Sequence, residues 1–261
     1  MSQTSNAIEG FKKLDKWKES PDAQVPQHFV YEHNRKRASN MGFPSRFQVG
    51  LSLNLTEHQV AAVFGWTTGD YRFLNPIARG QQQVEFEDYP FLPSNLTKMT
   101  FRLDRDDVLP YVNVLESALL KLTSSIPRKQ RLWRGHRRLV SRDLGSTVVL
   151  NGFTSATRDR EKALSFVEKA DEGKSNQRTL LAFDYHFSSR CISRISARRD
   201  EMEVLFPIDS TFEVVKAPEH DLEHDLEVVE AAITRFQKTM PNAKINLLYL
   251  KEVERSKNHA H

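Results

Sequence analysis

The sequence predicts a protein of the α+β class, and three observations lead to this prediction. Apolar residues recur at helical spacing from residue 51 to residue 123. From about residue 130 the pattern changes to short apolar strands, with turn signals such as Asn151-Gly152 between them. No repeat or solenoid period is visible along the chain.

The helical part begins after a polar stretch. Residues 1–48 are polar and weakly periodic, and we expect a leader that is flexible or serves in secretion. Thr56 and Gln59 have the form of a capping box, which predicts a helix start. A short helix is expected at 71–78 and a loop at 80–103. Asp104 is expected to cap a longer helix with an apolar stripe formed by Val108, Val112, Leu115, Leu119 and Leu122.

The second part is expected to be rich in strands. Strands are predicted at 130–135, 147–150, 152–157, 180–185, 211–215 and 245–250, with helices at 159–170 and 218–240. The predicted organisation is a leader (1–48), a helical lobe (49–128), a β-rich core (129–253) with a helical insert (218–240), and a polar tail (254–261).

Composition narrows the class of protein. The 261 residues carry 38 Lys and Arg against 34 Asp and Glu, so the net charge is +4, which permits an anionic ligand without arguing for nucleic acid. A single cysteine, Cys191, excludes an intrachain disulfide and fits a reducing compartment. No apolar run is long enough to predict a transmembrane helix, and the N-terminus lacks the apolar core of a Sec-type signal peptide.

Two carboxylates, Glu201 and Glu203, precede an apolar strand that continues to Pro207. Residues at i and i+2 of a strand point to the same face, so we expect these two side chains to project together. Paired acids of this kind serve as acid/base or cation-stabilising groups. The alternative is an edge strand with an acidic exposed face.

Several common catalytic motifs are absent from the sequence. There is no G-x-G-x-x-G, no P-loop, no H-E-x-x-H, no C-x-x-C and no G-x-S-x-G, which argues against Rossmann dehydrogenases, P-loop NTPases, zincins and α/β-hydrolases. Instead, Arg134, Ser155 and the Glu201/Glu203 pair follow one another on three predicted strands. Arginine can hold a diphosphate, serine can orient a carboxylate, and a carboxylate can stabilise an oxocarbenium ion. Together these groups suit cleavage of an N-glycosidic bond in a dinucleotide.

This order resembles the arginine–serine–glutamate class of mono-ADP-ribosyltransferases, the cholera-toxin-like family. The resemblance rests on Trp133-Arg134-Gly135, on Phe153 to Thr157 and on Glu201 to Pro207, and it extends to an aromatic and Tyr/Asn signature at 66–75. Two features depart from the family pattern. Ala156-Thr157 follows Ser155 where the family has Thr-Ser, and Arg198 and Arg199 precede Glu201 in place of an aromatic residue.

The resemblance implies a fold in which a helical lobe packs on a core of two small mixed or antiparallel β-sheets. It also implies that NAD is the co-substrate, that no metal is used, and that ADP-ribose passes to a side chain of a host protein. Arg134 would hold the phosphates or the adenosine-side ribose, and Gly135 would pair with the nicotinamide amide. Ser155 would position Glu203, which would bind the nicotinamide ribose and stabilise the transition state. Further residues expected at the NAD site are Thr157, Phe183, Tyr71 and Asn75.

Glu201 would orient or deprotonate the acceptor, and in the family a glutamate at this position accompanies arginine acceptors. Arg198 and Arg199 are expected to help recognise the acceptor protein. Transfer to a serine or threonine hydroxyl, NAD hydrolysis, and a catalytically inactive interaction module with the same fold remain open alternatives. A monomeric bacterial effector, secreted without a Sec signal and acting in the host cytosol, is the expected context, with no nucleic-acid or membrane partner.

Each candidate residue also has a structural interpretation. Arg134 could be a solvated cation in the basic run 131–142, which is also the basis of a nucleic-acid-binding alternative. Ser155 could cap a strand end, and Tyr71 and Asn75 could be packing residues. His220 and His224 have the spacing of two metal ligands on a helix, but no third ligand accompanies them.

Overall fold

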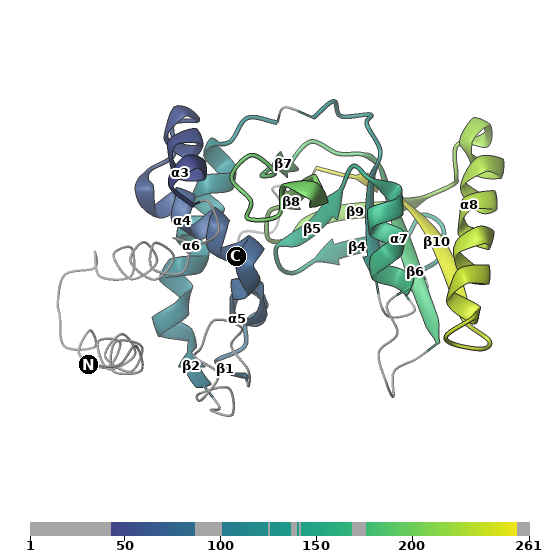
Figure 1. Ribbon diagram of the computed structural model, residues 1–261, viewed down its shortest axis with the longest axis horizontal. Coiled ribbons are helices and arrows are strands. Elements are labelled where there is room, and N and C mark those ends of the chain that lie inside the picture. The colour runs from purple at the N-terminus through teal and green to yellow at the C-terminus, as the bar shows by residue number, and fades with distance from the viewer. Residues whose placement is uncertain are drawn as a thin grey trace. The chain divides into compact units, whose positions relative to one another are not determined.

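The computed structural model of the chain describes residues 43–86, 101–124, 126–136, 140, 142–168 and 176–254 (Figure 1). The chain divides into two compact units. Residues up to Thr123 together with Ile192–Arg199 form the helical unit, and Ser124–Cys191 together with the residues from Asp200 onward form the sheet unit. Most of the predicted leader and nearly all of the predicted tail lie outside the described residues. Among the helices of the described ranges, none has the length and apolar character needed to cross a membrane.

The helical unit contains the predicted helices together with a small hairpin that the sequence reading missed. Its elements are α3 (Phe43–Ser52), α4 (Glu57–Gly65), the π-helical turn η1 (Trp66–Asp70), α5 (Tyr71–Ala78), β1 (Gln83–Phe86), β2 (Phe101–Asp104) and α6 (Arg105–Lys121). The prediction of a loop at 80–103 is wrong at its two ends, because β1 and β2 pair antiparallel there. Four-residue strands in a Gln- and Pro-rich context give too short an alternation to be recognised.

Helix α3 corrects the predicted boundary of the leader, since it begins at Phe43 and not after residue 48. Gly50 explains how α3 packs on α4. A Cβ atom at this position would lie 2.2 Å from Cγ2 of Val60, so only glycine permits this approach.

Helix α4 starts at the predicted capping box. The Thr56 hydroxyl accepts from the backbone N–H of Gln59 (3.3 Å), and the backbone N–H of Thr56 donates to Oε1 of Gln59 (3.0 Å). The Gln59 amide also donates to Ser117 Oγ of α6 at 2.9 Å. The predicted stripe of α6 is buried from Val108 to Leu122, which confirms the helical periodicity read from the sequence.

The sheet unit is built on one mixed sheet with the strand order β4-β9-β10-β6-β3-β5-β8-β7. The strands are β3 (Leu132–His136), β4 (Thr147–Leu150), β5 (Thr154–Thr157), β6 (Gln177–Tyr185), β7 (Arg190–Cys191), β8 (Glu203–Phe206), β9 (Ser210–Val215) and β10 (Lys244–Glu252). Among the strand pairs of the described residues, only that of β6 with β10 is parallel. The α+β class is therefore confirmed.

The expected core of two small sheets takes the form of one sheet with two parts, because backbone pairing joins all eight strands. The junction is narrow: β3 and β5 share a single aligned pair, Trp133 with Thr157. On one side of this junction lie five strands, and on the other lie the three strands β5, β8 and β7. The two predicted sheets are thus the two parts of one sheet, connected beside the residues predicted to be catalytic.

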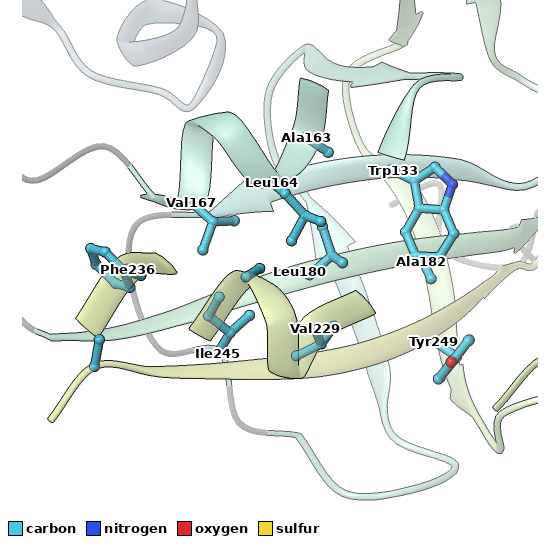
Figure 2. Close-up of a cluster of buried hydrophobic side chains, with 12 residues drawn as sticks. Trp133, Ala163, Leu164, Val167, Leu180, Ala182, Val229, Phe236, Ile245 and Tyr249 are labelled. Carbon is cyan, nitrogen blue, oxygen red and sulfur yellow. The ribbon is translucent and has the colours of Figure 1, made fainter. Parts of the chain in front are cut away.

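Two helices cover one face of the sheet. Helix α7 (Arg160–Glu168) and helix α8 (Glu219–Gln237) pack over β3, β6 and β10, with Leu164, Val167, Val229 and Phe236 in the shared cluster (Figure 2). Helix α8 corresponds to the predicted insert 218–240. Because it contributes buried side chains to this cluster, it is part of the core of the sheet unit.

Side chains of β6 point alternately to the two faces of the sheet and contribute to the core on each face. Leu180 and Ala182 point toward α7 and α8, whereas Leu181 and Phe183 belong to the cluster on the other face. The Phe183 ring is fully buried and lies 4.9 Å from the ring of Phe206 and 5.0 Å from that of Phe212. A fully buried ring presents no surface to a ligand, so we withdraw Phe183 from the candidate NAD-binding residues.

A buried carboxylate fixes α8 to its neighbours. Asp225 of α8 accepts hydrogen bonds from Arg131 Nη1 (2.7 Å), Arg160 Nη1 (2.6 Å) and the Tyr249 hydroxyl (2.9 Å). The guanidinium of Arg131 also lies over the rings of Trp133 and Tyr249. Burial, with the Asp225 carboxylate beside it, raises the pKa of Tyr249, so the phenol stays protonated and donates to Asp225.

Candidate active site

The two glutamates of the Glu-x-Glu sequence lie in different kinds of backbone. Glu203 is the first residue of β8, whereas Glu201 is the last residue of the 3-10 turn η3 (Arg199–Glu201). Met202 between them has φ of 44°, which interrupts the extended chain. The prediction that the two side chains share a strand face is therefore wrong in its premise, because i and i+2 alternation applies only within a continuous strand.

Ser155 and Glu203 are brought together by the pairing of β5 with β8. In this register Thr157 lies opposite Glu203 and Ser155 lies opposite Leu205, so Ser155 is a diagonal neighbour of Glu203 on the same face. The Ser155 hydroxyl donates to Oε1 of Glu203 at 2.6 Å. Glu203 is only 6% exposed, and a buried carboxylate requires such a donor.

Arg134 reaches the same strand from β3. Its Nη1 donates to the backbone carbonyl oxygen of Ser155 at 2.5 Å. The three residues predicted from the sequence are therefore linked in the order Arg134, Ser155, Glu203 beside the narrow junction between β3 and β5, through the carbonyl oxygen and the hydroxyl of Ser155. A charged fork, a hydroxyl and a buried carboxylate at one point can bind a phosphorylated sugar and stabilise positive charge on it.

Thr157 contacts the second glutamate, Glu201, at the main-chain carbonyl oxygen of that residue. Its hydroxyl donates to the carbonyl oxygen of Glu201 (2.7 Å) and accepts from the backbone N–H of Asp159 (3.0 Å). Thr157 is 7% exposed. The hydroxyl proton is thus used inside the protein, and the observed role of Thr157 is to position the turn that carries Glu201.

Lys162 adds an ion pair to this turn. Its Nζ lies 2.7 Å from Oδ2 of Asp200, the residue before Glu201. The hydrogen bond to Asp200, together with nearby carboxylates that include Glu201, raises the pKa of Lys162 above its ordinary value. Sequence reasoning did not identify Lys162 or Asp200, because 38 residues separate them and neither stands in a recognisable motif.

Gly135 is explained by packing. A Cβ atom on this residue would lie 2.3 Å from the carbonyl oxygen of Ala163 and 2.9 Å from Cγ2 of Val167, both in α7. The glycine therefore lets α7 lie directly on β3. Its predicted contact with nicotinamide remains a prediction.

The remaining predicted residues belong to the helical unit. Tyr71 of α5 is 46% exposed, and its ring centroid lies 5.9 Å from that of Trp66. Asn75 also lies in α5, where its carbonyl oxygen accepts from the N–H of Arg79. Both stay candidate NAD-binding residues on the strength of the family resemblance.

Arg198 and Arg199 end the segment 192–199, which the helical unit holds by its backbone. Nε of Arg46 donates to the carbonyl oxygen of Ser196 (2.6 Å), and the N–H of Ala197 donates to the Thr67 hydroxyl (3.0 Å). Both arginines are exposed. In the described ranges, no group of three or more His, Cys, Asp or Glu side chains has the arrangement of a metal site.

Comparison with known protein families shows that the chain matches the profile of one family. Residues 103–234, 132 of the 261 residues, match the profile of the family described as NAD:arginine ADP-ribosyltransferase. The match begins in β2 and ends within α8, so it includes Arg134, Ser155, Glu201 and Glu203. No curated protein sequence matches the chain significantly.

Solved structures with low sequence identity share the fold. The eukaryotic mono-ADP-ribosyltransferase ART2.2 has a TM-score of 0.52 at 14% identity, covering 95% of this chain and 89% of that one. A mutant of ART2.2 in complex with NADH has a TM-score of 0.52 at 16% identity, with 99% and 91% covered. The ADP-ribosyltransferase Vis from Vibrio splendidus, in complex with agmatine, has a TM-score of 0.50 at 17% identity, with 91% and 89% covered.

Proposed function

The chain belongs to the NAD:arginine ADP-ribosyltransferase family, and from this premise we propose that it transfers ADP-ribose from NAD to an arginine side chain of another protein. Family membership makes it an NAD-dependent protein mono-ADP-ribosyltransferase; the acceptor residue and the residue roles are our proposal. The observation that carries the proposal is the 2.6 Å hydrogen bond from Ser155 to the buried Glu203, with Arg134 bound to the Ser155 carbonyl oxygen.

On the NAD side, each of these three residues has one task. Arg134 holds the phosphates or the adenosine-side ribose, for which its rigid fork of donors is suited. Glu203 accepts from the 2′-hydroxyl of the nicotinamide ribose and stabilises positive charge at the anomeric carbon. Ser155 fixes the Glu203 carboxylate, so that it needs little reorganisation when that charge develops.

The reaction is a substitution at the anomeric carbon. The bond from C1′ to the nicotinamide nitrogen breaks, and its electron pair neutralises the pyridinium as nicotinamide leaves. A guanidino nitrogen of the acceptor then forms a bond to C1′. The proton that this nitrogen loses passes to Glu201, and from there to solvent.

On the acceptor side, Glu201 is the residue that favours arginine. The guanidinium pKa exceeds about 12, so the group needs a base beside it to become a nucleophile. Glu201 is half-buried at the end of a turn, so it keeps contact with solvent, from which an acceptor arrives. Agmatine, found in the complex of Vis, carries a guanidinium group, which supports this choice of acceptor.

Arg198 and Arg199 stand next to this position and are exposed. We propose that they select an acceptor protein with acidic residues near the modified arginine. We propose that this acceptor is a protein of a host cell. Transfer to a hydroxyl, hydrolysis of NAD and an inactive module are the alternatives that an experiment has to separate.

The test uses the full chain with labelled NAD and a eukaryotic cell lysate, beside the Glu203→Ala variant. We expect label on discrete protein bands, absent with the variant and removed by neutral hydroxylamine, which cleaves the arginine linkage. A label that resists hydroxylamine would indicate a hydroxyl acceptor, and free ADP-ribose without labelled protein would indicate a hydrolase. No consumption of NAD would refute the enzyme and leave the inactive module.

A further inference from the structure

Helix α7 and the turn before β8 are connected by an ion pair that the reaction scheme above does not use. We propose that Lys162, through Asp200, is a positioning residue for Glu201, and that it sets how NAD is divided between transfer to the acceptor and hydrolysis. The inference rests on the proposed function, because it concerns the acceptor side of the same site.

The geometry is a closed series of contacts around η3. Thr157 accepts from the N–H of Asp159, and Asp159 in turn accepts at Oδ1 from the N–H of Lys162 at the start of α7 (3.1 Å). Lys162 then binds Asp200 at 2.7 Å. The series closes where the Thr157 hydroxyl donates to the carbonyl oxygen of Glu201.

The turn is thereby held at two residues, and at a different kind of atom in each. Glu201 is held at its carbonyl oxygen by the Thr157 hydroxyl, a bond that acts on the backbone of the turn. Asp200 is held at its side chain, which fixes the rotation of the turn about that carbonyl. Lys162 therefore supplies a constraint that Thr157 alone does not give.

Charge points to the same role. The ammonium of Lys162 neutralises Asp200, and its raised pKa reflects the nearby carboxylates of Asp200, Glu201 and Asp159. Without Lys162, two like charges would stand side by side on one short turn, and their repulsion would favour other orientations. A cationic acceptor could then be held by Asp200 instead of Glu201, too far from the base.

The ion pair is too exposed to serve mainly in folding. The side chain of Lys162 is 29% exposed and that of Asp200 is 70% exposed, and such pairs contribute little to stability. A misplacement of about 1 Å at a reacting group, in contrast, costs up to about 100-fold in rate. We therefore expect an effect on the acceptor step with little effect on the unfolding temperature.

The test measures both products from the same protein. Nicotinamide release gives total NAD turnover, and labelled ADP-ribosyl-agmatine gives transfer to a guanidinium probe. The variants are Lys162→Met, which keeps length and removes charge, Lys162→Arg, which keeps charge, and the exchanged pair Lys162→Asp with Asp200→Lys. Lys244→Met serves as the matched control, because Lys244 is an exposed lysine at the start of β10.

For Lys162→Met we expect the ratio of transfer to hydrolysis to fall about 5- to 10-fold, through a higher KM for agmatine and a lower kcat of transfer. Nicotinamide release without acceptor should stay within about twofold, and the unfolding temperature within about 3 °C. Lys162→Arg and the exchanged pair should regain most of the ratio, and Lys244→Met should not change it.

Three results would overturn the inference. An unchanged ratio in Lys162→Met would mean that the ion pair does not position Glu201. An equal loss of transfer and hydrolysis, or a large fall in unfolding temperature, would indicate a structural role only. Native protein that turns over NAD without modifying agmatine would refute the proposed arginine acceptor, and the inference with it, since no guanidinium step would exist to position.

Discussion

Glu203 and Glu201 are two residues apart in sequence and differ in almost every structural respect. Glu203 opens a strand, is 6% exposed, and is held at its carboxylate by Ser155. Glu201 ends a turn, is half-buried, and is held at its main chain by Thr157. The first is fixed by the β-sheet itself, whereas the second depends on a few side-chain contacts around η3.

This difference suits the two tasks that we assign to them. A group that stabilises a developing cation works best when it is rigid and shielded from water. A group that meets a protein acceptor has to be reached from solvent and can tolerate some adjustment. Mutations that act on one glutamate, on its support, or on the scaffold common to both should therefore have distinct effects on transfer and hydrolysis.

The largest effect is expected for Glu203→Gln. The amide keeps an oxygen acceptor for the Ser155 hydroxyl but carries no charge, so we expect kcat for nicotinamide release to fall about 10³-fold, with and without acceptor. Nicotinamide release and label transfer would be measured side by side, and the unfolding temperature would show that the fold is kept. Residual hydrolysis at the native rate would contradict the assignment of Glu203 to the NAD side.

Glu201→Gln should separate the two activities. Loss of a general base costs about 10²-fold or more, so transfer to agmatine should fall by at least that amount while hydrolysis of NAD stays within a few-fold. Both can be read from one reaction with NAD labelled in the adenosine part. Equal losses of the two activities would mean that Glu201 also contacts NAD.

Ser155→Ala probes the support of Glu203. A hydrogen bond to a charged group contributes about 1.5–3 kcal/mol, so removal of the hydroxyl should slow nicotinamide release about 10- to 100-fold, equally in transfer and hydrolysis. The ratio of the two products is the informative quantity. A change in that ratio would show that Ser155 also acts on the acceptor side.

Asp225→Asn should lower the stability of the protein and leave the ratio of transfer to hydrolysis unchanged. Asp225 is 2% exposed and binds Arg131, Arg160 and Tyr249, so loss of its charge should cost about 2–3 kcal/mol of unfolding free energy. We expect the unfolding temperature to drop by about 5–10 °C. Product ratios measured well below that temperature should equal those of the native chain, and a shifted ratio would assign α8 a part in catalysis.

Local signals predicted a large part of the fold. The capping box at Thr56, the buried stripe of α6 and the strand at 147–150 appear where the sequence places them, because each depends on residues close together in the chain. The sequence also predicts three candidate site residues, Arg134, Ser155 and Glu203, because their residue types and their order along the chain match those of the family. The structure adds the register that makes Ser155 a neighbour of Glu203.

Other features could not be predicted because tertiary contacts decide them. The positive φ of Met202 is adopted by a residue with no preference for it, and it moves Glu201 out of the strand. Helix α8 is expected from the sequence only as a helical insert at 218–240, but its residues Ala232 and Phe236 are buried against the sheet. The partnership of Lys162 with Asp200 spans 38 residues and has no local trace in the sequence.

The absence of a side chain at Gly135 has a consequence for changing this protein by design. The backbone of α7 lies directly on β3 at this point, and the same helix carries Lys162 next to Ala163, whose carbonyl oxygen faces Gly135. A residue with a methyl group at position 135 would lift α7 and withdraw Lys162 from Asp200. A substitution at position 135 would then change the ratio of protein modification to NAD hydrolysis without replacing either glutamate.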